Sequence, residues 1–138
     1  MIVADTSGVF SALDRSQPRH EAAREVVEHA NVLVLSPFVL TELDYLLATR
    51  ISVEASRALL ADVEGGAYEL ATFTAADVGE AARVIERYAD LEIGLADASL
   101  VVLADRYDTD RVLTLDERHF RALRKRGGAP FQLLPADR

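Results

Sequence analysis

Short apolar segments alternate with longer helix-forming segments along the chain, and this alternation restricts the possible folds more than any other feature. The apolar segments are expected to form strands at residues 1–5, 31–35, 68–73, 111–115 and 131–134. The segments between them are expected to form helices at residues 7–13, 18–29, 37–50, 52–65, 74–90, 95–107 and 117–125. Strands that alternate with helices indicate an α/β fold in which a mainly parallel sheet lies between helical layers.

Local signals support several of these boundaries. Ser36 followed by Pro37 is typical of a helix N-cap with proline at the first helical position. Thr74 and Asp77 have the spacing of a capping box. The chain has no internal repeat and no linker-like segment, so we expect residues 1–138 to form a single domain.

Composition excludes several classes of protein. The chain has no cysteine, which rules out disulfides and thiolate zinc sites. No apolar run approaches the roughly 18–20 residues that a membrane-spanning helix needs, and the N-terminus lacks the basic and apolar regions of a signal peptide. We therefore expect a soluble, cytoplasmic protein without a membrane partner.

Net charge leaves the question of a nucleic-acid partner open. The total is −8, which does not favour binding to a polyanion. However, residues 111–126 contain five arginines and one lysine against only two acidic residues. Such a run is either a solvated helix face or a contact surface for phosphates.

Four acidic residues lie within or beside apolar sequence, where an ionised carboxylate is costly unless it is paired. They are Asp5, Glu42, Asp97 and Asp116. Asp5 ends the first predicted strand and Asp116 follows the fourth, and in parallel sheets ligands bind beyond the carboxyl ends of the strands. Each acid alone has a simpler interpretation, as a helix cap, a helix-dipole partner or a solvent-exposed edge. Together they indicate one site for a hard divalent cation such as Mg²⁺ or Mn²⁺.

Periodicity alone does not decide whether Glu42 or Asp44 belongs to this set. Glu42 has apolar residues three and four positions away on both sides, and Asp44 is nearly as interior by the same test.

We expect His20 and His29 to be surface residues. His119 could approach the site, but packing or capping is the simpler expectation. No G-x-S-x-G turn and no phosphate-binding glycine loop is present.

Four motifs, in order over almost the whole chain, resemble the PIN-domain family and in particular the VapC toxins of VapBC toxin–antitoxin systems. They are Ile2-Val3-Ala4-Asp5-Thr6-Ser7, Ser36-Pro37-Phe38-Val39-Leu40-Thr41-Glu42-Leu43, Gly94-Leu95-Ala96-Asp97-Ala98 and Thr114-Leu115-Asp116-Glu117-Arg118-His119-Phe120. This resemblance implies a PIN-like three-layer α/β/α sandwich. It also favours Glu42 over Asp44, because Glu42 matches the second acid of the family.

The resemblance implies a function as well. Asp5, Glu42, Asp97 and Asp116 would bind Mg²⁺ or Mn²⁺ and catalyse endoribonuclease cleavage of structured RNA, tRNA or rRNA, by water attack on the phosphodiester, which inhibits translation. Ser7 and Thr114 would support the site, and Arg118, Arg121 and Arg124 would position the RNA. A VapB-type antitoxin would be the partner, and the toxin would form a homodimer. The alternative is a non-catalytic PIN scaffold that binds antitoxin or RNA.

Overall fold

The computed structural model describes all 138 residues and contains one five-stranded sheet. Its strands are β1 (Ile2–Ala4), β2 (Leu33–Leu35), β3 (Glu69–Leu70), β4 (Arg111–Leu113) and β5 (Gln132–Leu134). The order across the sheet is β3-β2-β1-β4-β5, and every neighbouring pair is parallel. The predicted α/β fold with a parallel central sheet is therefore confirmed.

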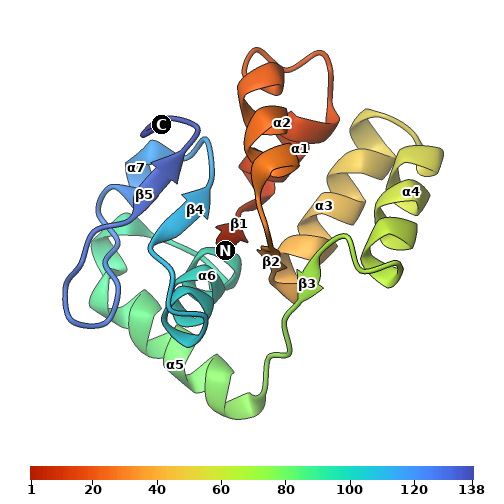
Figure 1. The fold of residues 1–138 in the computed structure, drawn as a ribbon. Coiled ribbons are helices and arrows are strands. Elements are labelled where there is room, and N and C mark those ends of the chain that lie inside the picture. The colour runs from red at the N-terminus through yellow and green to blue at the C-terminus, as the bar shows by residue number, and fades with distance from the viewer.

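Helices cover both faces of this sheet. They are α1 (Thr6–Leu13), α2 (His20–His29), α3 (Pro37–Arg50), α4 (Val53–Glu64), α5 (Ala75–Arg87), the 3₁₀ helix η1 (Ala89–Leu91), α6 (Leu95–Arg106) and α7 (Glu117–Phe120). The chain moves outward from β1 to β3, then crosses back to β4 on the other side of β1. Because such crossovers are right-handed, this reversal places α1–α4 on one face and α5–α7 on the other. In Figure 1, α1–α4 lie above and to the right of the strands, and α5 and α6 lie below and to the left of them.

Predicted helix starts are confirmed where the sequence signal was local. The Ser36 hydroxyl accepts a hydrogen bond from the Phe38 amide at 3.2 Å, and Pro37 begins α3. At the start of α5, the Thr74 amide donates to the Asp77 carboxylate and the Asp77 amide donates to the Thr74 hydroxyl. These caps satisfy backbone donors that a helix leaves free in its first turn.

Several predicted boundaries are wrong, and the physical cause is clear for three of them. The strand expected at residues 68–73 shortens to β3, which lies at the sheet edge with only β2 beside it. The helix expected at 117–125 ends at Phe120, because the Lys125 amide turns back to the Ala129 carbonyl. The second helix begins at His20 instead of residue 18, since the Asp14 carboxylate accepts hydrogen bonds from Ser16 and Gln17 and holds a turn there.

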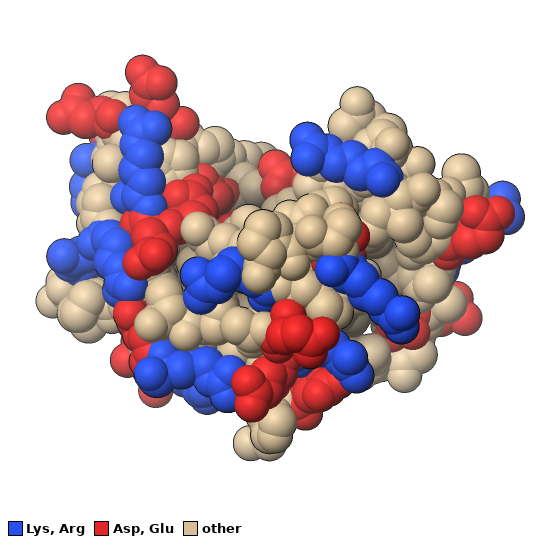
Figure 2. Space-filling model, turned by 90° about the horizontal axis from the view of Figure 1, so that it is seen from above, with Lys and Arg blue, Asp and Glu red and all other residues tan.

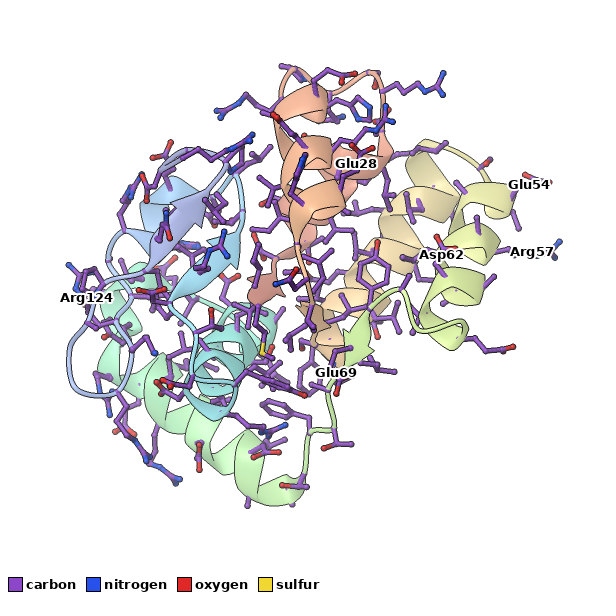
Figure 3. All side chains as sticks on the ribbon, in the orientation of Figure 1. Glu28, Glu54, Arg57, Asp62, Glu69 and Arg124 are labelled. Carbon is purple, nitrogen blue, oxygen red and sulfur yellow. The ribbon has the colours of Figure 1, made fainter.

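The core is built around β1 and α6. All three residues of β1 are almost completely buried, as are the seven consecutive residues 98–104 of α6. Charged side chains such as Glu54 and Arg57 of α4 point outward at the periphery (Figure 3). His20 is also buried, with Nδ1 2.9 Å from the Ser11 carbonyl oxygen, so its expected surface position is wrong. None of the helices combines the length and apolar character needed to span a membrane.

Strand register brings three polar side chains together at the carboxyl edge of the sheet. Ala4 of β1 pairs with Leu35 of β2 and with Leu113 of β4. One residue further along each strand stand Asp5, Ser36 and Thr114. The chain turns to opposite faces after β1 and β4, so a crevice opens between these two strands, where parallel α/β sheets bind ligands.

We predict that Gly8 is essential for the close approach of α1 to β4. A Cβ atom at Gly8 would lie 2.5 Å from the Leu113 carbonyl oxygen, which also accepts the Asp5 amide. We expect Gly8→Ala to lower the free energy of unfolding by about 2–3 kcal/mol, measured by urea denaturation.

Gly79→Ala is the matched control, because it lies within α5 and its nearest neighbour would be an Arg83 nitrogen at 3.6 Å. This change should stabilise the protein by about 0.5–1 kcal/mol, since alanine favours a helix over glycine. Equal effects of the two substitutions would contradict the steric explanation.

Candidate metal centre

Asp5 occupies the N-cap position of α1 but does not cap it. Its side chain is 5% exposed and accepts two hydroxyl hydrogen bonds at Oδ2, from Ser7 at 2.8 Å and from Thr114 at 2.7 Å. Since one oxygen accepts both hydroxyl protons, that oxygen carries no proton of its own. Asp5 is therefore held by one hydroxyl from α1 and by a second hydroxyl from the chain that follows β4.

Ser7 and Thr114 link Asp5 to the chain that follows β4. The Ser7 hydroxyl accepts the Leu115 amide at 2.9 Å, and the Thr114 hydroxyl accepts the Asp116 amide at 2.9 Å. Each hydroxyl thus accepts from a backbone amide and donates to the carboxylate. Burial raises the pKa of Asp5 above its usual range, and the hydrogen bonds from Thr114, Ser7 and the Thr6 amide oppose this effect.

The structure separates Glu42 from Asp44, which periodicity left ambiguous. Glu42 Oε1 accepts a hydrogen bond from the Thr6 hydroxyl at 2.5 Å, so it lies against the start of α1 beside Asp5. Asp44 instead accepts from the hydroxyl of Ser56 on α4. Glu42 therefore faces the crevice, while Asp44 joins α3 to α4.

Asp97 lies in the first turn of α6 and comes close to the other acids. Its pKa is raised to about 6, first by burial and then by the negative charge of Asp5, with smaller contributions from Asp116 and Glu42. His119 opposes these effects. The three acids that raise its pKa are the other predicted site residues, so all of them lie near enough to Asp97 to interact with its charge.

A buried hydrogen bond fixes the relative position of the two helices that carry Glu42 and Asp97. The hydroxyls of Ser36, at the start of α3, and Ser99, in α6, lie 2.7 Å apart, and both residues are fully buried. The Ser99 hydroxyl also donates to the Ala96 carbonyl. These contacts hold the first turns of α3 and α6 together at the crevice.

Asp116 has two structural contacts. Its Oδ1 caps α7 by accepting the His119 amide at 3.1 Å, so the capping interpretation holds for this residue. Its Oδ2 lies 3.0 Å from His119 Nδ1, which is also 3.3 Å from Asp97 Oδ2. One ligand atom from each of Asp97, Asp116 and His119 lies within 4.8 Å of the others.

His119 is the site residue that our sequence interpretation assigned to packing or capping. The structure places its ring between two of the predicted acids. The signal was present in the sequence, because a residue three positions after Asp116 shares its face on a helix. It was not decisive, since the same spacing also fits a residue that only caps or packs.

The three arginines expected to contact RNA differ in their contacts. Arg121 pairs with Asp137 at 2.7 Å and with Glu117 at 2.8 Å, and these carboxylates raise its pKa. Arg124 donates to the backbone carbonyls of Arg121 and Leu123. Arg118 is exposed, and its guanidinium forms no ion pair or hydrogen bond with another residue. Basic side chains lie in separate groups among acidic ones on the face shown in Figure 2, so they form no continuous basic surface there.

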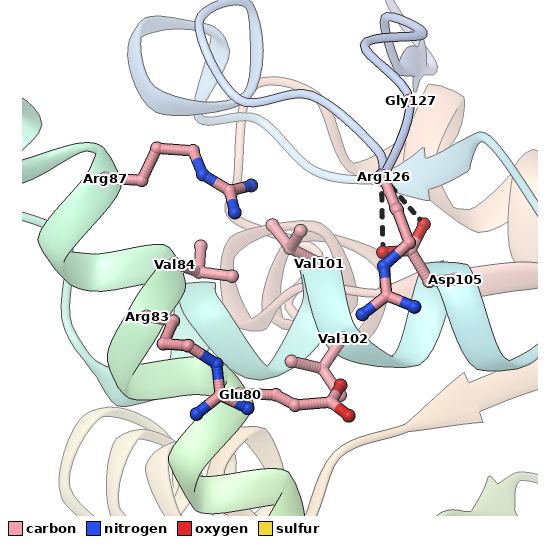
Figure 4. A pocket seen from close by; sticks show the side chains of 9 residues that line it. All are labelled: Glu80, Arg83, Val84, Arg87, Val101, Val102, Asp105, Arg126 and Gly127. Carbon is pink, nitrogen blue, oxygen red and sulfur yellow. Dashed lines mark hydrogen bonds between the residues drawn. The ribbon is translucent and has the colours of Figure 1, made fainter.

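A separate cavity of about 200 Å³ lies between α5, α6 and the chain around Arg126. Arg83 and Arg87 of α5 line it, and the Arg126 amide donates to the Asp105 carboxylate (Figure 4). Asp105 is near the end of α6, whereas Asp97 is in its first turn. This cavity is therefore at the other end of the helix and is not part of the acidic site.

Comparison with known proteins identifies the class. The PIN domain profile matches residues 2–126. Ribonuclease VapC26 of Mycobacterium tuberculosis (strain ATCC 25618 / H37Rv) is 49% identical over 135 residues, covering 97% of this chain and 100% of that protein. The chain therefore belongs to the PIN-domain family, within its VapC group.

Solved structures share this fold. VapC20 of Mycobacterium tuberculosis, described as a Sarcin-Ricin loop cleaving toxin, superposes with a TM-score of 0.79 at 22% identity, covering 86% of this chain and 92% of that chain. VapBC2 of Rickettsia felis, bound to a DNA fragment from its promoter, superposes with a TM-score of 0.67 at 19% identity, covering 96% of this chain and 98% of that chain. FitAcB of Neisseria gonorrhoeae superposes with a TM-score of 0.64 at 20% identity, covering 96% of this chain and 97% of that chain.

We predict that Asp97 destabilises the metal-free protein at neutral pH. Its pKa is raised to about 6 from 3.8, so the folded state binds more protons than the unfolded state between these values. Stability from this group is therefore present below about pH 4 and is lost as the pH rises to about 6. In a chelating buffer, we expect Asp97→Asn to be more stable than wild type by about 1–2 kcal/mol at pH 7.

At pH 4 the two proteins should differ less, because Asp97 is then protonated in the folded state. Urea unfolding at both pH values measures the difference. A gap between wild type and variant that does not change with pH would contradict this prediction.

Proposed function

We propose that this protein is the toxin of a VapBC toxin–antitoxin system and acts as a metal-dependent endoribonuclease. The name of the 49% identical relative supports ribonuclease activity. The observation that carries the proposal is the state of Asp5, which is buried at a strand end and is held by hydroxyl groups without capping its helix. A carboxylate kept in such a costly position is explained by a cation that binds it.

The residues present fit a divalent cation. Asp5, Glu42, Asp97 and Asp116 supply carboxylate oxygens, the donors that Mg²⁺ and Mn²⁺ prefer. The hydroxyl hydrogen bonds to Asp5 both go to Oδ2, so its Oδ1 receives no side-chain donor. Burial raises the pKa of Asp97, and repulsion from the other acids raises it further, so a bound cation would relieve that repulsion. When bound, the metal would supply a water of lowered pKa and stabilise charge on the phosphodiester.

The side chains around the acids would keep them in place for this chemistry. Ser7 and Thr114 fix the Asp5 carboxylate, and Thr6 fixes Glu42. Arg118 has a free guanidinium two residues from Asp116, so we assign it to an RNA phosphate. Arg121 and Arg124 are occupied by other contacts and are weaker candidates for this role.

The similarity to VapC proteins also suggests the substrate and the partners. We propose that the substrate is structured RNA, tRNA or rRNA, cut by water attack so that translation stops in the cytoplasm. A VapB-type antitoxin would inhibit the protein, as the paired names of the VapBC2 and FitAcB structures suggest. We further propose that the chain acts as one domain and assembles as a homodimer.

A substitution pair on α3 tests the nuclease. Glu42→Gln removes an acid that faces the crevice, and we expect cleavage of structured RNA in Mg²⁺ or Mn²⁺ to fall by at least about 100-fold. Asp44→Asn, two residues away, keeps an oxygen that can accept from Ser56 and should cut at the wild-type rate. Gel analysis of RNA incubated with antitoxin-free protein measures both rates.

A chelator should abolish cleavage by wild type. Equal cleavage by wild type and Glu42→Gln would indicate a contaminating nuclease. No cleavage by either protein, with any structured RNA or metal, would favour a non-catalytic scaffold instead. Induced expression in bacteria gives an independent measurement, because growth arrest by wild type and Asp44→Asn, but not by Glu42→Gln, is expected of a toxin.

A further inference from the structure

His119 Nδ1 is a buried polar atom without a hydrogen-bond partner. It nevertheless lies 3.0 Å from Asp116 Oδ2 and 3.3 Å from Asp97 Oδ2. The two findings agree if Nδ1 is close to both oxygens but does not point at either one. The N–H bond or lone pair of Nδ1 lies in the plane of the imidazole ring, and that direction would then pass beside both oxygens. A buried polar atom left without a partner is unfavourable.

The separations suit a shared cation. Divalent ions lie about 2.0–2.2 Å from imidazole nitrogen and carboxylate oxygen, so two ligands at a right angle are about 3.0 Å apart and tetrahedral ligands about 3.4 Å apart. The two measured distances from Nδ1, 3.0 Å and 3.3 Å, fall at these values.

Packing around α7 fixes the ring in this position. Asp116 caps the helix and His119 follows three residues later, so both side chains lie on one face. The next residue, Phe120, is fully buried and packs edge-on against Phe131, with the ring centroids 6.4 Å apart. The imidazole is therefore held at the acids before any ligand arrives.

We propose that Nδ1 of His119 is a nitrogen ligand of the metal centre, beside Asp97 and Asp116, and that it gives the site a preference for Mn²⁺ over Mg²⁺. This inference rests on the metal-dependent function proposed above. Mn²⁺ is a first-row transition ion that can accept a nitrogen ligand beside carboxylates, whereas Mg²⁺ strongly prefers oxygen ligands and bound water. For Nδ1 to bind a metal, the ring proton must be on Nε2.

Pulsed electron paramagnetic resonance of the full-length protein loaded with Mn²⁺ tests the ligand directly. Wild type should show a coupling between Mn²⁺ and a directly bound ¹⁴N, and His119→Asn should lose it. His29→Ala is the matched control, because His29 is exposed on α2 and its loss should leave the coupling unchanged. His119→Gln serves as a second variant if His119→Asn folds poorly.

Calorimetric titration gives a second measurement without RNA. We expect His119→Asn to weaken Mn²⁺ binding by about 10–100-fold, and Mg²⁺ binding much less. Mn²⁺ bound to wild type without ¹⁴N coupling would overturn the histidine ligand and leave the carboxylate site intact. Equal losses for the two metals would overturn the proposed preference. Failure of wild type to bind either ion would overturn both this inference and the metal-dependent nuclease.

Discussion

Burial of the Asp5 carboxylate at the end of the central strand constrains much of the structure around it. Water cannot solvate this group, so the protein must provide donors, and it does so with hydroxyls from α1 and from the residue after β4. These hydroxyls also accept the amides of Leu115 and Asp116. The hydrogen bonds that the buried Asp5 carboxylate requires therefore fix the positions of β1, α1 and the β4–α7 connection relative to one another. The other acids lie around that connection.

Local sequence signals predicted the features that depend on neighbouring residues. The parallel α/β fold, the cap at Ser36 and the capping box at Thr74 follow from patterns a few residues long. The four acids were also found this way, since a carboxylate in apolar sequence is conspicuous. Periodicity could not decide whether Glu42 or Asp44 belongs to the site, because α3 packs on two sides. The partners in the fold decide it, since Glu42 contacts Thr6 of α1 and Asp44 contacts Ser56 of α4.

Features that depend on distant partners could not be predicted in this way. The third strand is short because it lies at the edge of the sheet, and edge position is a property of the whole topology. Arg121 has the charge of an RNA contact, but its guanidinium is paired with Asp137, sixteen residues further along. His119 was undervalued for the same reason, since its proximity to Asp97 exists only after α6 and α7 meet.

The order of elements along the chain has a consequence for the timing of activity during synthesis. The crevice lies between β1, which is made first, and β4, which begins at Arg111 of 138 residues. On the proposed function, a growing chain that has not reached Asp116 has only three of the four acids and no second wall for its site. The acidic site can therefore be complete only after residue 116 of 138 has been synthesised.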